Sequence, residues 1–453
     1  MDVVTLSRIQ FALNSGFHYL YPPMSIGLGL MLVIMEGLYL KTKDIKYKEM
    51  TTFWIKIFAL TFALGVATGL VQVFAFGTNW ARYSRFVGDV FGSALASEGV
   101  FAFFLESGFL GILLFGWNRV GPKIHYLSTI CVCLGAHFSA VWIIVANSWM
   151  QTPAGFFIEQ TPLGPRAVTT EFWQMVFNPS MIDRLSHVVL GCWLTGAFFV
   201  MSVGAYYLLR KIHLHIARSM IKLSLWMALV FLILQLFSGD SSARLIARYQ
   251  PAKLAAFEGI YKTQESTPIS VIGWVDPQTE QVHSLKIPGL LSFLTYRNFE
   301  TPVTGLDQIP RDEWPKVAVV FQTYHLMVMM WAAMFLITVL GLWYWKKKKL
   351  EKTPWLLWSM IISVGLPHIA QQCGWISTEM GRQPWIVWKM LRTSDGVSAS
   401  ISAPQVAGSI AMFVVVYMLL FALFLFILDR KIKHGPEKDH EETNDLVYRD
   451  VMK

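Results

Sequence analysis

Long apolar segments separated by short polar loops run through nearly the whole sequence. A helix needs about 20 mostly apolar residues to cross the hydrocarbon core of a bilayer. Nine segments meet this requirement, and they cover residues 15–40, 52–76, 94–117, 126–149, 185–209, 219–238, 317–345, 354–376 and 404–428. Apolar residues lie on every side of each segment, unlike in an amphipathic surface helix. The pattern therefore predicts an all-α integral membrane protein with nine transmembrane helices in helix bundles.

The charged loops predict how these segments are oriented. The loops after the first, third, fifth and seventh segments contain KTKDIKYK, NRVGPK, RKIHLHIAR and WKKKKLEK, and the C-terminal tail begins DRKIKHGPEK. With nine spans, all five basic stretches lie on one side. Because Lys and Arg are enriched in cytoplasmic loops, we expect a cytoplasmic C-terminus and an N-terminus outside. His125, His213 and His215 belong to these loops and are expected to be solvated.

The polar connections divide the chain into four parts. Residues 1–238 contain the first six helices, residues 239–316 form a long outer connection, residues 317–430 contain the last three helices, and residues 431–453 form a charged cytoplasmic tail. A connection as long as the outer one usually has a function or is disordered.

Composition agrees with a membrane protein. The 453 residues are 54% hydrophobic and 15% charged, whereas soluble proteins have about 45–50% apolar and about 25% charged residues. A water-soluble domain, a disordered chain and a disulfide scaffold do not fit these values. The four cysteines lie in apolar runs and lack the spacing of a zinc site. The net charge of +9 comes from the basic loops and does not indicate nucleic-acid binding.

Several polar or metal-ligating side chains interrupt the apolar segments. Inserting an ionisable side chain costs about 2.5–3.5 kcal/mol, so its presence indicates a site. With the orientation above, the outer half of the membrane contains His18, Glu98, His187, Met327 and Glu379. Several helices thus place such residues at one level, as a buried cofactor layer requires.

His187 and Met327 lie at comparable depth, about 8–12 residues beyond a proline (Pro179 and Pro315) that could open the helix. A His and a Met at equal depth on facing helices suit a low-spin haem with both axial positions filled. The alternative is a core histidine and one of 21 methionines that only pack.

Carboxylates occur in two further patterns. Glu98 and Glu106 are about 12 Å apart along one helix, where they can pass protons toward a buried centre. They can equally be protonated acids that bond to neighbouring helices. Trp375, Glu379 and Arg382 follow at spacings of four and three and can share one helix face. A carboxylate ligand could leave the other side of a haem iron open for a gas.

Longer motifs resemble a known family. The stretch SRIQFALNSGFHYLYPP surrounds His18, ASEGVFAFFLESGF contains Glu98 and Glu106, and SAVWIIVANSWMQTP, GDSSARLIARYQPAKLAAFEG and GWISTEMGRQPW follow. Over nearly its whole length the chain resembles subunit I of cytochrome bd quinol oxidase. The most specific stretch is GRQPW after a Trp-x-x-x-Glu pattern. The resemblance implies a respiratory enzyme that oxidises quinol and reduces dioxygen to water.

The resemblance also implies roles for the candidate residues and the presence of two haem b and one haem d. His187 and Met327 resemble the axial ligands of a low-spin haem b. His18 and Glu379 resemble the iron ligands of a high-spin haem b and of haem d, and which residue holds which haem stays open. Other residues match haem neighbours (Trp375, Arg382, Arg8), proton-delivering carboxylates (Glu98, Glu106) and a polar route (Ser139, Asn147).

The connection 239–316 resembles the family's quinol loop in its short-loop class. Lys253 and Glu258 match residues used for quinol oxidation, in which Glu258 would accept a proton and Lys253 would donate to the quinol oxygens. A surface cap is the alternative. Many relatives have Arg two residues before the haem methionine, whereas this chain has His325, so the charge beside the low-spin haem differs.

On this resemblance, quinol protons are released outside. Dioxygen is reduced with cytoplasmic protons that pass Glu106, Ser139 and Glu98, so a proton motive force arises without pumping. The resemblance implies the bacterial cytoplasmic (inner) membrane and its lipid, a second multi-span subunit (subunit II) and sometimes a small single-span subunit. Whether the substrate is ubiquinol or menaquinol stays open.

Two other interpretations remain. A family member with haem b in place of haem d would keep the same ligands but lack the red-region absorption of a chlorin. A proton-coupled secondary transporter would also bury carboxylates. Transporters, however, tend to show repeats and broken helices near the midplane, and a transporter would hold no haem.

Overall fold

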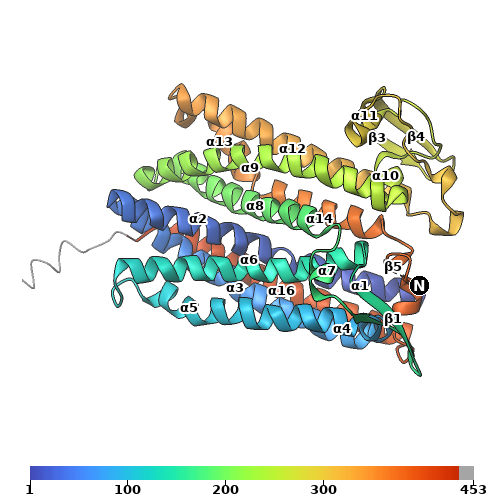
Figure 1. The fold of residues 1–453 in the computed structure, drawn as a ribbon. Coiled ribbons are helices and arrows are strands. Elements are labelled where there is room, and N and C mark those ends of the chain that lie inside the picture. Colours follow the sequence, from blue (N-terminus) through green and yellow to red (C-terminus); the bar gives the residue numbers. More distant parts are fainter. Residues whose placement is uncertain (438–453) are drawn as a thin grey trace, which may run out of the picture.

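The computed structural model describes residues 1–437, which form a bundle of roughly aligned helices (Figure 1). The long helices are α1 (Val3–His18), α2 (Tyr21–Thr42), α3 (Ile45–Asn79), α4 (Ala81–Glu98), α5 (Phe104–Phe115), α6 (Pro122–Gln151), α8 (Met181–Arg210), α9 (Leu214–Tyr249), α12 (Val317–Lys346), α14 (Gly365–Met380) and α16 (Ala403–His434). Shorter helices are α7 (Phe172–Val176), α10 (Pro251–Glu258), α11 (Leu290–Tyr296), α13 (Pro354–Ile362) and α15 (Thr393–Gly396). Of the predicted tail 431–453, residues 438–453 lie outside the described residues.

Within residues 1–437, eight helical stretches are long and apolar enough to cross a membrane. The predicted apolar segments all coincide with these stretches except 354–376, which forms α13 and α14 with a break at residues 363–364. Each of these two helices is too short to cross alone. A ninth crossing made from the pair, and the orientation of the bundle, remain predictions.

Two further helix breaks lie beside candidate residues. The first apolar stretch bends after His18, where α1 ends and α2 begins with prolines in its first turn. A proline lacks the backbone N–H that would continue the preceding helix. Directly after Glu98, a π-helix (Gly99–Phe103) separates α4 from α5, and such π-bulges are frequent at functional sites. The breaks change which way the following side chains point.

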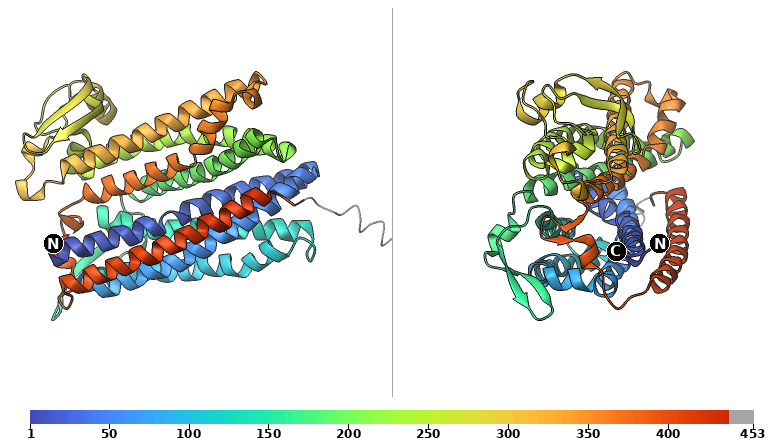
Figure 2. Two further views of the ribbon diagram at one scale, coloured as in Figure 1. Left: turned by 180° about the vertical axis from the view of Figure 1, so that it is seen from behind. Right: turned by 90° about the vertical axis from the view of Figure 1, so that its right-hand side faces the viewer.

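Small residues bring the central helices together. A Cβ atom on Gly27 of α2 would lie 2.2 Å from the backbone oxygen of Cys192 on α8, and one on Gly196 would meet the Gly27 backbone at 2.3 Å. The two backbones are therefore in direct contact, which only glycine permits. Around this crossing, α2, α3, α8 and α9 bury the largest apolar cluster. The last helix, α16, lies at the edge of the bundle (Figure 2).

Three β-hairpins within the described part of the chain, which the helical pattern did not predict, lie at one end of the bundle (Figure 1). They pair β1 (Phe156–Thr161) with β2 (Gly164–Thr169), β3 (Ile269–Asp276) with β4 (Gln281–Ile287), and β5 (Trp385–Val387) with β6 (Leu391–Arg392). Helix α9 continues to Tyr249, past the predicted start of the outer connection at residue 239. The connection then folds as α10, the β3–β4 hairpin and α11, with its own apolar cluster against the start of α12.

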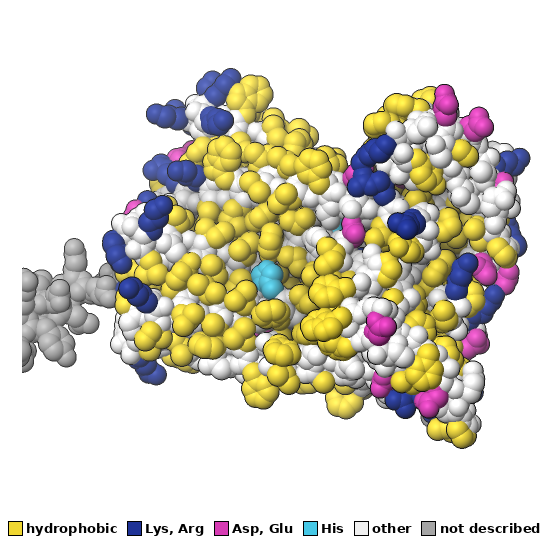
Figure 3. Space-filling model, in the orientation of Figure 1, with side chains coloured by type: hydrophobic (Ala, Val, Ile, Leu, Met, Phe, Trp, Pro, Cys, Tyr) yellow, Lys and Arg dark blue, Asp and Glu magenta, His cyan; other side chains and the backbone are white. Residues whose placement is uncertain are grey.

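The surface has the charge distribution of a membrane protein. Figure 3 shows apolar side chains along the helices on one face, with charged side chains at the two ends: mostly Lys and Arg at the end away from the hairpins, and both signs of charge at the hairpin end. At this basic end the chain connects α2 to α3, α5 to α6, α8 to α9 and α12 to α13. An uncharged belt between two polar ends matches the environment of a bilayer.

Candidate functional site

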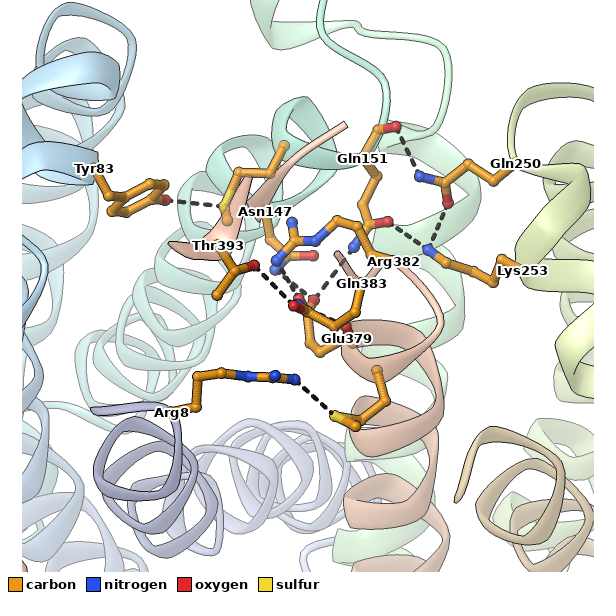
Figure 4. Close-up of polar contacts among 12 residues, drawn as sticks. Arg8, Tyr83, Asn147, Gln151, Gln250, Lys253, Glu379, Arg382, Gln383 and Thr393 are labelled. Atoms are coloured by element: carbon orange, nitrogen blue, oxygen red, sulfur yellow. Dashed lines mark hydrogen bonds and ion pairs between the residues drawn. The ribbon is translucent and has the colours of Figure 1, made fainter. Parts of the chain in front are cut away.

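Glu379, in the last turn of α14, is the centre of a polar network near the hairpin end (Figure 4). Its carboxylate accepts hydrogen bonds from Asn147 at 3.1 Å and Gln151 at 3.3 Å, both on α6, and pairs with Arg382. The structure thus brings together Glu379, Arg382 and Asn147, which the sequence singled out. Gln151 was not predicted, although it lies one helical turn after Asn147 on the same face.

The network contains more hydrogen-bond donors than its side chains satisfy. The Arg382 side chain is only 5% exposed, yet its Nε and Nη1 atoms have no hydrogen-bond partner among the described residues, and neither does Nε of Arg184. Another nitrogen of Arg184 donates to Asn147, and the Arg184 guanidinium lies 5.9 Å from the Trp375 ring centroid. An unpaired buried donor costs about 1–3 kcal/mol. The site therefore suits a further anionic group.

Lys253, on α10, is fully buried and points into this network. Its ammonium donates to the side-chain oxygens of Gln151 and Gln250, and Gln250 in turn donates to the Gln151 backbone oxygen at 3.0 Å (Figure 4). Gly381 leaves room for the lysine stem, because a Cβ atom there would lie 2.8 Å from Lys253 Cγ. Burial lowers the pKa of Lys253 well below its usual value, and the Arg184 charge adds to this effect. Gln151 thus joins Lys253 to Glu379.

Glu258, at the end of α10, has a different environment. Its carboxyl group is buried, and its Oε2 atom has no hydrogen-bond partner among the described residues. Burial raises the pKa of Glu258 to about 7, while hydrogen bonds from the Ser270 backbone and the Tyr324 hydroxyl oppose that rise. The structure therefore directs Lys253 and Glu258, the predicted quinol residues, to different neighbours.

His187 and Met327 lie on separate helices that both pack against α14. The His187 imidazole on α8 is approached by the Gln235 amide nitrogen at 3.1–3.2 Å and by the Ser238 hydroxyl at 3.3 Å, both on α9. The Met327 sulfur on α12 lies against Gly374, where a Cβ atom would come within 3.0 Å of it. Glycine at residue 374 therefore leaves the space in which this sulfur is held. That His187 and Met327 bind the iron of the same haem stays a prediction.

His18 is the last residue of α1 and faces α3. Its Nδ1 atom lies 2.9 Å from the Thr68 hydroxyl, and a Cβ atom on Gly69 would lie 3.2 Å from its Cε1 atom. The residue after it, Tyr19, packs edge-on against Trp375 with ring centroids 5.5 Å apart. This contact connects the predicted His18 and Trp375 positions.

Three of the remaining predicted residues contact α6 or α14. Glu98 accepts a 2.5 Å hydrogen bond from Ser139, and the polar route through these two residues stays a prediction. Glu106 is buried against Gly135, where a Cβ atom would lie 2.4 Å from its Cγ atom. Arg8 donates to the Met380 sulfur at 3.4 Å, one residue from Glu379.

One histidine that was expected to be solvated is buried instead. His125 lies in the first turn of α6, is 1% exposed, and packs its ring on Trp117 at 4.1 Å between centroids. The expectation was wrong because the loop before it is short and α6 begins at Pro122, so the histidine already faces α2 and α5. His215 is exposed as expected, whereas His213 is half-buried against Tyr207.

The chain is similar to proteins of known activity over nearly its whole length. The family model of cytochrome bd terminal oxidase subunit I matches residues 6–436. The chain is 39% identical to cytochrome bd ubiquinol oxidase subunit 1 of Bacillus subtilis, over 97% of this chain and 96% of that protein. It is 34% identical to cytochrome bd-II ubiquinol oxidase subunit 1 of Escherichia coli, over 97% and 98%. The solved bd oxidase from Geobacillus thermodenitrificans matches with a TM-score of 0.89 at 30% identity, covering 96% of this chain and 99% of that one.

Proposed function

The chain belongs to the family of cytochrome bd terminal oxidase subunit I, and from this premise we propose how its residues share the work of the enzyme. It is an integral membrane protein and a quinol:oxygen oxidoreductase of the respiratory chain, with haem cofactors and quinol as substrate. Bound haems supply one-electron transfer and the iron at which dioxygen is reduced.

The observation that carries the proposal is the set of unpaired donors around Glu379. The free N–H groups of Arg382 and Arg184 suit the propionate carboxylates of a haem, and the Glu379 side chain keeps 32% of its surface exposed for a ligand. We assign His18 and Glu379 to the irons of the oxygen-reducing haems, and His187 and Met327 to the low-spin haem. The glycines at 69 and 374 support these assignments, because the absence of a Cβ atom leaves space beside the His18 ring and beside the Met327 sulfur.

Glu258 is the group that we propose accepts a proton from quinol. Its carboxyl oxygen Oε2 is buried and unpaired, so a quinol hydroxyl that enters the outer connection finds an acceptor there. Lys253 retains its proposed role as donor to quinol oxygen, and Gln151 and Gln250 hold its ammonium in place before quinol binds. Proton release then occurs at the hairpin end, which we place outside.

Glu106, Glu98 and Ser139 are proposed to supply protons from the cytoplasmic side. Glu98 already shares a hydrogen bond with Ser139, so a proton on either oxygen can pass to the other. Uptake on one side and release on the other charge the membrane without a pump. We further propose two haem b and one haem d, a second multi-span subunit as partner, and the bacterial cytoplasmic membrane as location.

The first experiment is a dithionite-reduced minus oxidised absorbance spectrum of the purified complex, with haem extraction alongside. We expect haem b and a long-wavelength chlorin band in the natural protein. The variants His187→Ala and Met327→Leu should lose the low-spin signal, whereas His368→Ala, a matched change on α14, should keep it. If the extraction yields haem b alone, the proposal changes to an oxidase with haem b in place of haem d. A well-folded complex without haem would contradict it.

A further inference from the structure

A further buried acid, Glu36, lies far from the Glu379 network, near the basic end of the bundle. The Glu36 Oε1 atom on α2 lies 2.7 Å from the His125 Nδ1 atom on α6, within hydrogen-bond distance, and each side chain is 1% exposed. The other carboxylate oxygen of Glu36 accepts a hydrogen bond from the Thr129 hydroxyl, one turn further along α6. We call Glu36, His125 and Thr129 the Glu36 cluster. None of these residues has a role in the redox site described above.

The cluster lies just inside the polar end of the bundle. His125 occupies the first turn of α6, and Glu36 precedes the end of α2 at Thr42. The second ring nitrogen of His125 lies 3.2 Å from the Leu113 backbone oxygen. Trp117, which packs on the His125 ring, also has the Lys48 ammonium 5.9 Å from its ring centroid. A few residues therefore separate the cluster from the water at the basic end.

Stability alone gives little reason to bury such a pair. Burying polar and ionisable groups costs free energy that their mutual contacts must recover, and apolar residues of similar volume often stabilise a fold equally well. Histidine, by contrast, can take up a proton at one ring nitrogen and release one from the other near neutral pH. A carboxylate beside it can receive that proton. The Glu36 cluster thus has the chemistry of a proton relay as well as of a structural contact.

Helix α6 connects this cluster with the known polar positions. At about 100° per residue, His125, Thr129, Ser139 and Asn147 fall within an arc of about 80° on this one helix. Ser139 donates a hydrogen bond to Glu98, and Asn147 donates one to Glu379. Polar groups therefore recur on one side of α6 from the basic end of the bundle to the redox site.

Glu106 lies between the two halves of this polar stripe. It packs against Gly135, six residues after Thr129 and four before Ser139. These intervals correspond to rises of about 9 Å and about 6 Å along the helix. Ordered water, which bridges polar groups at little cost, can span such gaps.

We propose that the Glu36 cluster is the cytoplasmic entry station of the proton route to Glu106, an inference that rests on the proposed oxidase function. His125 takes a proton from the aqueous side and passes it to the Glu36 carboxylate. Glu36 then releases it toward Glu106 and is ready for the next proton. The protons are consumed together with the quinol electrons when dioxygen is reduced to water, so no further reactant is needed.

The test uses the complete oxidase complex reconstituted in lipid vesicles, with the variants Glu36→Gln and His125→Gln. Both keep the side-chain volume while removing the carboxylate or the imidazole. We expect haem content, the low-spin spectrum and electron transfer from quinol to be unchanged in a single turnover. Proton uptake from the medium, followed with a pH-sensitive dye, should slow at least about tenfold, and Glu36→Asp should restore part of the rate.

A matched control lies on the same helix. His137→Gln removes another imidazole of α6, which is half-buried and bonds to the Cys133 backbone oxygen and to Trp193 but to no carboxylate among the described residues. The complex with His137→Gln should take up protons at the rate of the natural protein. Natural uptake rates in Glu36→Gln and His125→Gln with full haem would overturn the inference. If Glu36→Gln loses haem, the proton-uptake rate of His125→Gln alone tests the inference. Loss of haem in both variants would contradict the inference and show that the cluster has a structural role. Failure of the oxidase function itself would appear in the unsubstituted complex.

Discussion

At the scale of single residues, burial determines what the one basic and the one acidic side chain of α10 can do. Lys253 and Glu258 lie on the same short helix, but Lys253 faces amide oxygens whereas one oxygen of Glu258 faces no partner among the described residues. A buried carboxyl group prefers its neutral form, because the charged form loses hydration. Glu258 is therefore able to change its charge near neutral pH.

Quinol oxidation should depend on pH through Glu258. Burial raises the pKa of this carboxyl to about 7, so it is protonated and unable to act as a base below that value. We expect kcat/KM for quinol to rise about tenfold per pH unit below about pH 7 and to level off above it. Oxidation rates between about pH 5.5 and about pH 8.5 measure this profile.

Two variants make this measurement specific. Glu258→Gln should be much slower and should lose the rising limb, whereas Glu265→Gln, an exposed carboxylate in the same connection, should keep the natural profile. A natural rising limb in Glu258→Gln would exclude this group as the base.

Single residues also mark how far sequence reasoning reached in the site. Glu379 and Arg382 were predicted together because residues three apart on a helix are neighbours. The contacts of Gln151 with Glu379 and Lys253, and the pairing of His125 with Glu36, join residues about 90–230 positions apart. No local pattern encodes such pairs, so the sequence identified Glu379 and Lys253 but missed Gln151, which joins them, and it missed Glu36 altogether.

At the scale of helices, the apolar runs predicted where the helices lie but not where they are interrupted. A run of apolar residues shows where a helix meets lipid, which is why 126–149 and 185–209 lie inside α6 and α8. The bend after His18, the π-helix after Glu98 and the break between α13 and α14 depend on packing between helices. Each of these irregularities lies close to a candidate residue or on the helix that carries one, so they affect the site more than the lengths of the helices do.

One contact between helices tests the assignment of Met327. Gly374→Ala would place a Cβ atom 3.0 Å from the Met327 sulfur, which must then move by a few tenths of an ångström. Overpacking of this kind costs about 1–3 kcal/mol. We expect a weaker low-spin haem signal and a lower midpoint potential, because a displaced thioether stabilises reduced iron less. A spectroelectrochemical titration measures both quantities.

The same helix offers a control for this change. A Cβ atom on Gly365 meets nothing within 4 Å, so Gly365→Ala should leave the spectrum and the potential unaltered. If both variants behave like the natural protein, Met327 is not a ligand of the low-spin haem.

At the scale of the whole molecule, the two polar ends differ in both charge and structure. The basic end contains short connections, whereas the other end contains the three hairpins, the outer connection and the N-terminus (Figures 1 and 3). The hairpins escaped prediction because short strands among aromatic and polar residues give little periodic signal beside strong helical runs. They cover the end at which the Glu379 network and Glu258 lie, so the proposed redox site is closer to one side of the membrane.

The orientation of the chain determines whether this asymmetry can conserve energy. Gln278→Cys lies in the exposed turn between β3 and β4, and Lys347→Cys lies in the connection between α12 and α13. A membrane-impermeant maleimide should label Gln278→Cys in intact cells and Lys347→Cys only after permeabilisation, because Lys-rich loops face the cytoplasm. The native cysteines are at least half-buried in apolar helices and give the background. The opposite labelling would place Glu258 on the cytoplasmic side, so that quinol protons would be released where dioxygen reduction consumes them. Turnover would then build no proton gradient, and the proposed role of the enzyme in energy conservation would fail even with every haem in place.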